Sequence, residues 1–252
     1  MEIQQIVITI ISAISLSLLS GFVILKRQSL IGDAFSHIAL PGIALALSLK
    51  IDIFWGALIF LLLGTFLIIA IREKIKIFLE AVVGFIFLLF LSLGKIFIED
   101  EELIESLFGN IQKATTLDLG IAIIVCSFII FTILKFKDKL AIISFSEEFA
   151  QAEGINVKKI DFIFLLMIAM AIALGIRVTG VLLVGSYLIL PGLSCLLITK
   201  SFNRFLLLSG FYGIISSCLG IFLSRFIELG PAIVISQSLI FIIFFILKSF
   251  KL

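Results

Sequence analysis

The sequence has few of the residues that usually carry chemistry. Its 252 residues include one histidine, one tryptophan, three cysteines and three prolines, and only 14% of them are charged. The cysteines stand singly within apolar runs, at positions 126, 195 and 218. Because no CxxC pair is present, neither a disulfide framework nor a zinc knuckle is indicated, and we expect the cysteines to be packing residues.

Motifs of catalytic and nucleotide-binding proteins are also missing. The chain contains no GxxxxGK[ST] phosphate-binding loop, so we do not expect it to hydrolyse ATP itself. It contains no HExxH or GxSxG motif, and one histidine near one aspartate is a poor basis for an intramembrane enzyme. We therefore expect a protein that is not an enzyme and that takes any energy it uses from another chain or from an ion gradient.

What the chain has in excess is apolar sequence. Hydrophobic residues make up 62% of it, and the mean hydropathy is +1.35. A soluble domain is roughly half apolar, so this excess indicates a lipid bilayer as the solvent. Several apolar segments approach the roughly 20 residues that a helix needs to cross a bilayer. The segments fall at approximately 3–25, 34–49, 53–71, 79–98, 117–134, 160–176, 178–198, 205–224 and 231–247.

These segments predict an all-α integral membrane protein, a polytopic bundle of eight or nine transmembrane helices in a single domain over residues 1–252. The second and ninth segments are short, and eight spans result if one short segment is re-entrant. Basic residues follow the first apolar segment, at Lys26 and Arg27, and do not precede it, which is unlike a signal peptide. We expect this segment to remain as the first helix.

The basic residues indicate the orientation of the bundle. When the segments are threaded alternately from an external N-terminus, fourteen lysines and arginines fall at internal ends and five at external ends, which accounts for all nineteen. This asymmetry agrees with the positive-inside rule and predicts an external N-terminus and a cytoplasmic C-terminus. The five external residues are Lys50, Lys95, Lys113, Arg177 and Arg225.

Two connections are longer than the others. Residues 99–116 are acidic and predicted to be external, which fits either a vestibule that concentrates cations or a plain solvated loop. The internal connection covers about 140–159, and its SEEFAQAEG stretch predicts a short helix with Ser146 as N-cap and Gly154 at its end. Such a helix suits docking on a partner, and a plain loop is the alternative.

The only histidine lies in a polar stretch, GDAFSHIALPGIALA, at residues 32–46. Asp33 and His37 are four residues apart, which on a helix puts them on one face. A carboxylate and a neutral imidazole suit zinc and manganese, and ionisable groups within a span usually face a cavity or a partner. In the structural alternative, Asp33 caps the helix and His37 bonds a neighbouring helix. The threading puts the pair near the internal mouth of the bundle.

Six motifs, in order along nearly the whole chain, resemble the membrane permease subunits of the zinc/manganese class of bacterial ABC importers. In LFGNI, many relatives have aspartate in place of Asn110. The motifs are KRQSLIGDAFSHIALPG, EAVVGFIFLLFLSLG (80–94), LFGNI (107–111), FSEEFAQAEGINV (145–157), VTGVLLVGSYLILPGLSC (178–195) and LGPAIVISQSLIF (229–241).

The resemblance implies the transmembrane subunit of an ATP-driven importer of divalent transition-metal ions, in a bacterial cell membrane. The metal would be zinc or manganese, with iron as a further candidate, and would be cargo; no permanently bound cofactor is expected. Two copies would form the translocation path. The further partners would be a cytoplasmic ABC ATPase dimer, which binds the ATP, an extracytoplasmic metal-binding protein and the lipid bilayer, without nucleic acid.

The resemblance also implies roles for individual residues. Asp33 and His37 would be transient metal ligands on the path. A helix that couples the chain to a groove on the ATPase would contain Glu148, Phe149, Ala150 and Gly154. Helix breaks that a gate uses are expected at Pro41 and Gly42, and at Pro191 and Gly192.

Other interpretations remain open from the sequence. Asp118 and Glu228 are candidates for a funnel that collects incoming cations, or simply interfacial charges. A permease for a metal chelate or vitamin would usually be a longer chain. A secondary ion-coupled carrier would need more carboxylates inside its spans than this sequence has.

Overall fold

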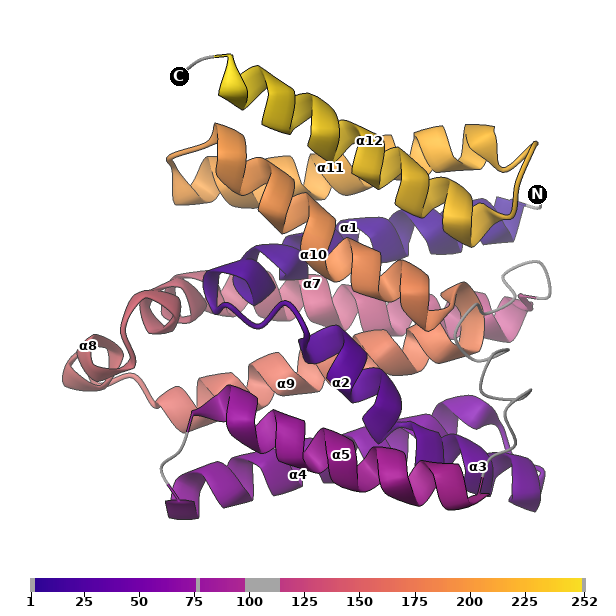
Figure 1. The fold of residues 1–252 in the computed structure, drawn as a ribbon, viewed down its shortest axis with the longest axis vertical. Coiled ribbons are helices and arrows are strands. Elements are labelled where there is room, and N and C mark those ends of the chain that lie inside the picture. The colour runs from indigo at the N-terminus through magenta and orange to yellow at the C-terminus, as the bar shows by residue number, and fades with distance from the viewer. Residues whose placement is uncertain (1–2, 76–77, 98–113, 251–252) are drawn as a thin grey trace.

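The computed structural model of the protein describes residues 3–75, 78–97 and 114–250. Over these residues the chain is helical and contains no strand. The long helices run back and forth between two ends of one bundle (Figure 1). One end carries the short helix α8 and the end of the last helix, and we call it the α8 end. The opposite end carries the start of the first helix, and we call it the far end (Figure 1).

The helices follow the predicted apolar segments. The elements are α1 (Ile3–Leu25), α2 (Ile31–Ile38), α3 (Leu40–Leu49), α4 (Ile53–Ile75), α5 (Leu79–Phe97), α7 (Thr116–Phe145), α8 (Glu147–Ala152), α9 (Val157–Leu174), the π-helical turn η2 (Gly175–Thr179), α10 (Val181–Ile198), α11 (Phe202–Leu223) and α12 (Leu229–Ser249).

Eight stretches among the described residues are long and apolar enough to cross a membrane, counting α2 with α3 and α9 with η2 as one stretch each. Helix α5 adds a shorter apolar stretch, Leu79–Gly94. The prediction of an all-α polytopic membrane protein is confirmed, whereas the sidedness of the two ends stays a prediction from the basic residues. The LFGNI motif and nearly all of the acidic segment 99–116 lie outside the described residues.

Helix α1 is the buried centre of one half of the bundle and packs against α7, α10 and α11. The hydroxyls of its buried Ser15 and Ser20 donate to carbonyl oxygens three residues earlier, which satisfies them within apolar surroundings. Small residues let the neighbouring backbones approach closely. A Cβ atom on Gly213 of α11 would lie 2.6 Å from the carbonyl oxygen of Ala13, so only glycine fits this contact.

The segment with the polar pair is bent at Ala39, between α2 and α3. Ala39 keeps a right-handed helical conformation, so the interruption is a kink and not a loop. Pro41 occupies the first turn of α3, where its missing N–H is least costly. Gly42 lies against Gly56 of α4, and a Cβ atom there would overlap the Gly56 carbonyl oxygen. The pair Pro41–Gly42 therefore starts α3 and lets it approach α4.

The second expected break does not interrupt its helix. Helix α10 continues through Pro191, although proline removes one backbone hydrogen bond from the ladder. Gly192 packs on α1, where a Cβ atom would lie 2.6 Å from the carbonyl oxygen of Ser20. The close packing of α10 on α1 holds the helix together at a position where local preference favours a break.

Candidate functional site

Helix α2, which carries the polar pair, lies near the middle of the bundle. Figure 1 shows it between α10 and the pair α4–α5, away from both ends. Helix α1 ends at Leu25, Arg27 adopts the left-handed conformation (φ 58°), and residues 28–30 lead inward before α2 begins. Asp33 lines a groove together with Arg27 and Glu80, which also border a cavity beside α8. The depth of the pair in the membrane stays a prediction from the threading.

The geometry of the pair agrees with its spacing in the sequence. His37 Nε2 lies 3.8 Å from Asp33 Oδ1. The Asp33 side chain is 72% exposed and lines a groove of about 480 Å³ between α2 and α5, together with Glu80. The His37 ring meets Phe87 of α5 edge-on at 5.2 Å between centroids. The carboxylate is thus open to the groove while the imidazole is partly enclosed beside it.

The structural alternative for this pair is not realised. The N-cap residue of α2 is Leu30, and no side chain caps the helix. His37 Nδ1 is buried without a hydrogen-bond partner in the described part of the chain. Within the described residues, Asp33 therefore does not cap α2, and His37 Nδ1 forms no hydrogen bond to a neighbouring helix.

The described residues of one chain do not form a complete metal site. Among the described residues, no group of three histidine, cysteine, aspartate or glutamate side chains comes close enough to hold a metal ion. Asp33 and His37 together offer one carboxylate and one imidazole. A cation held by this pair alone would keep most of its coordination sphere for other ligands.

The short helix predicted in the internal connection is present as α8. The Ser146 hydroxyl accepts the Phe149 N–H at 3.1 Å, and Gly154, at φ 75°, ends the turn that follows. Hydrogen bonds from its own backbone N–H and from the Ser146 hydroxyl lower the pKa of the Glu148 carboxyl. Ala150 is fully buried, whereas the Phe149 side chain is 57% exposed. The predicted helix is confirmed, and it presents an aromatic ring at the end of the bundle.

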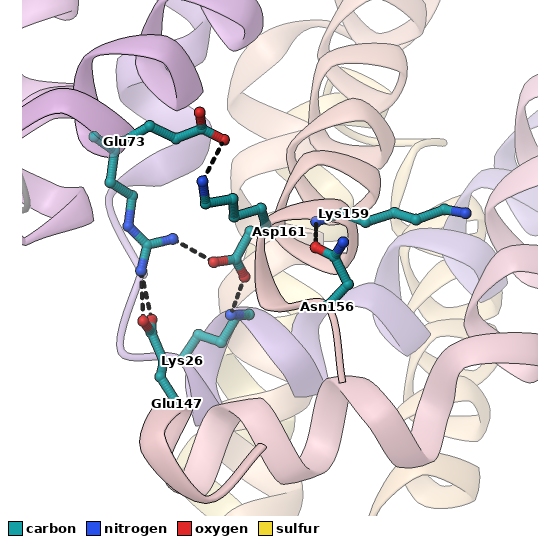
Figure 2. Close-up of polar contacts among 8 residues, drawn as sticks. Lys26, Glu73, Glu147, Asn156, Lys159 and Asp161 are labelled. Carbon is teal, nitrogen blue, oxygen red and sulfur yellow. Dashed lines mark hydrogen bonds and ion pairs between the residues drawn. The ribbon is translucent and has the colours of Figure 1, made fainter. Parts of the chain in front are cut away.

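Beside α8 lies a cavity of about 910 Å³, and Lys26, Arg72 and Glu147 are among the residues that line it. These three side chains belong to one network of ion pairs. Its centre is Asp161 of α9, whose side chain is 1% exposed. Lys26 Nζ donates to Asp161 at 2.8 Å, and Arg72 of α4 pairs with its other oxygen. The Arg72 guanidinium also donates to both oxygens of Glu147, at 2.6 and 2.7 Å (Figure 2). The start of α8 is thereby tied to α4 and α9, and through Asp161 to the end of α1.

A second network lies at the far end. Arg177 of η2 pairs with Asp52, just before α4, and with Asp118 in the first turn of α7. Asp118 also forms a capping box with Thr115. Asp118 is therefore engaged in an ion pair and a helix cap, and Glu228, the other candidate for a cation funnel, is exposed just before α12.

Sequence reasoning missed both networks. Their members lie far apart along the chain: Arg72 and Asp161 differ by 89 in residue number, and Asp118 and Arg177 by 59. One signal was present: Asp161 stands at the start of the segment 160–176, which is expected to span the membrane, and an ionisable side chain within a span usually has a partner. The identity of that partner depends on the packing of the helices.

Comparisons with known proteins agree with the motifs. The profile of the ABC 3 transport family matches residues 2–248. "Manganese import system permease protein ScaB" of Streptococcus gordonii is 34% identical over 246 residues, which cover 94% of this chain and 88% of that protein. "High-affinity zinc uptake system membrane protein ZnuB" of Buchnera aphidicola is 34% identical over 230 residues, 88% of each chain.

A solved structure supports the same assignment. A chain of "PsaBC from Streptococcus pneumoniae in complex with Fab" superimposes with a TM-score of 0.81 at 31% identity, covering 96% of this chain and 90% of that one. The protein is a multi-pass membrane protein that belongs to the ABC 3 transport family, as its motifs predicted.

Proposed function

We propose that the chain is the transmembrane subunit of an ATP-driven importer of divalent transition-metal ions in a bacterial cell membrane. The names of its relatives, a manganese import permease and a zinc uptake membrane protein, support this substrate class, with iron as a further candidate. The chain is a transport subunit and not an enzyme. The sequence has no phosphate-binding loop, so ATP is hydrolysed by a separate ABC ATPase.

The observation that carries the proposal is the pair Asp33–His37 on α2. It lies on a helix that packs against α5, α9 and α10, the buried His37 Nδ1 has no hydrogen-bond partner among the described residues, and the carboxylate faces a groove. Carboxylate oxygen and imidazole nitrogen are both good ligands for zinc and manganese. An ion in transit must be released again, so a site that holds it weakly serves transport better than a closed one.

A second copy of the chain would complete the site. In a two-fold dimer each subunit presents the same surface, so two pairs facing across the axis offer four ligands, the number that zinc prefers. The translocation path then runs between the two copies. This arrangement agrees with the finding that no third ligand approaches the pair within the described residues of one chain.

The partners attach at opposite ends. Helix α8 receives the ATPase at the internal side, because it is capped, carries the exposed Phe149 and lies at the end where the basic residues gather. An extracytoplasmic metal-binding protein delivers the ion at the far end.

Metal uptake by cells tests the proposal. The chain is produced with its ATPase and metal-binding protein in cells that lack their own high-affinity manganese and zinc importers. Asp33→Asn and His37→Gln should each lower uptake at least about tenfold, because losing even an outer-shell partner of a metal ligand costs about 10–100-fold. The control is Asp138→Asn, which neutralises an exposed carboxylate of α7. Wild-type uptake by both variants, at equal amounts in the membrane, would rule out the ligand role.

A further inference from the structure

Helices α4 and α9 are joined by an ion pair at each of their two ends. They run antiparallel and pack against each other. At the α8 end, Arg72 in the last turn of α4 pairs with Asp161 near the start of α9. At the far end the charges are reversed, and Asp52 before α4 pairs with Arg177 in η2, which continues α9. Each helix therefore contributes an acid at one end and a base at the other.

The same two arginines also hold the segment α7–α8. At the far end Arg177 pairs with Asp118 in the first turn of α7. At the α8 end Arg72 binds Glu147, the first residue of α8, which follows α7 directly. The same three segments, α4, α7–α8 and α9, are thus connected at both ends of the bundle. We call these two groups of ion pairs clamps: the α8-end clamp is Arg72 with Asp161 and Glu147, and the far-end clamp is Arg177 with Asp52 and Asp118.

The clamps are more enclosed than an ordinary surface ion pair. The side chains of Arg72 and Arg177 are 18% and 16% exposed. One acid of each clamp is buried, Asp161 at 1% and Asp118 at 8%, whereas the other acid, Glu147 or Asp52, is 42% or 40% exposed. Lys158 and Glu73, which also join α9 to α4, are 67% and 42% exposed. Separating an enclosed pair leaves an uncompensated charge in surroundings of low polarity, whereas an exposed pair exchanges its partner for water at little cost.

We propose that Arg72 and Arg177 are positioning residues of the transport cycle, which lock α4, α7 and α9 into one body that carries a displacement of α8 to the far end. The inference rests on the proposed function, in which α8 receives the ATPase. Packed helices slide past one another by small shear movements when only apolar contacts join them. Sliding of α4 along α9 would separate both ion pairs at once. Over the 23 residues of α4, about 35 Å, the clamps keep the two ends in register.

The body also borders the candidate metal site. Asp161 holds Lys26, which lies between the end of α1 and the non-helical residues that lead into α2. A displacement of α8 thus reaches the connection that leads into α2, the helix that carries Asp33, and, at the same time, the far end at which the metal arrives.

The first test removes the far-end clamp, on the side of the bundle opposite to α8. The chain is reconstituted in vesicles with its ATPase and metal-binding protein, and ATP hydrolysis and manganese uptake are measured together. Arg177→Gln should leave the ATPase bound and basal hydrolysis intact. It should lower uptake, and the stimulation of hydrolysis by the loaded metal-binding protein, by about tenfold, within the range of coupling between distant sites.

Two controls separate positioning from a general structural role. Arg177→Lys keeps the charge and should recover part of the coupling, and Lys158→Gln, which breaks the exposed pair, should behave as wild type. Full coupling in Arg177→Gln would overturn the clamp. A wild-type complex that moves no metal would overturn the proposed function instead.

A reversible cross-link gives the sharper test. Asp52→Cys and Arg177→Cys are combined in a background with Cys126, Cys195 and Cys218 replaced by alanine. A short bifunctional methanethiosulfonate then joins the two thiols. We expect low uptake before cross-linking and recovery afterwards, because the clamp stays closed throughout the cycle. If cross-linking blocks the remaining uptake until a reductant is added, the pair must open during transport and the proposal is wrong.

Discussion

Replacing Asp161 by asparagine should destabilise the protein strongly, because this carboxylate neutralises two cations at once. Asparagine keeps the size and shape of the side chain and removes only its charge. Lys26 and Arg72 would then face a neutral amide at the α8 end. Lys26 is 5% exposed and has no other acid within reach in the described structure, so its charge is left without compensation.

The size of the effect follows from burial. Removing one partner of a buried ion pair costs about 3–5 kcal/mol. Arg72 is 18% exposed and keeps its bonds to Glu147, so the lower end of that range applies, about 3 kcal/mol. For a chain of this length, 1 kcal/mol shifts the midpoint of thermal unfolding by about 2–4 °C, so we expect a fall of about 6–12 °C.

The measurement is the temperature at which half of the purified protein, in detergent, is lost from the monodisperse peak of a size-exclusion column. Lys158→Gln is the matched control, because it removes a charge from an exposed pair on the same helix, worth about 0–1 kcal/mol. If Asp161→Asn lowers the midpoint no more than Lys158→Gln does, the buried network does not stabilise the α8 end and the reasoning fails.

Two further predictions concern close packing and the coupling helix. Gly42→Ala should cost about 1–3 kcal/mol, because its Cβ overlaps the Gly56 carbonyl, while Gly84→Ala, whose Cβ meets nothing within 4 Å, should leave the midpoint unchanged; equal midpoints would contradict the close contact. Gly154→Pro should abolish the stimulation of ATP hydrolysis by the loaded metal-binding protein, because proline cannot adopt φ 75°, while Gly154→Asn should retain it. Normal stimulation in the proline variant would exclude α8 as the coupling helix.

Local sequence patterns predict much of the fold. Segment lengths predict the long helices because a bilayer demands about 20 apolar residues for each span. The short helix α8 was equally predictable, since Ser146 and Gly154 act on their own neighbours in the chain. Proline usually breaks a helix, but α10 continues through Pro191, where Gly192 packs closely on α1.

The candidate site was predictable in its local geometry, but the path of the chain that leads to it was not. The spacing of Asp33 and His37 put them on one helical face, and the structure agrees. Residues 28–30, which lead into α2, are not helical, and no periodic pattern in the sequence predicts the course that they take. The charge networks depend on which helices become neighbours. A sequence shows that Asp161 needs a partner, and only the packed bundle shows that the partners are Lys26 and Arg72.

The most direct test of the account is ATP-driven manganese uptake into vesicles that contain the chain, its ATPase and its metal-binding protein. The double variant Asp33→Asn with His37→Gln is compared with the wild type at equal amounts of assembled complex. We predict that the variant binds the ATPase and hydrolyses ATP but accumulates no manganese above the level without ATP. Wild-type accumulation by the double variant would show that the ion passes through this bundle without the pair on α2.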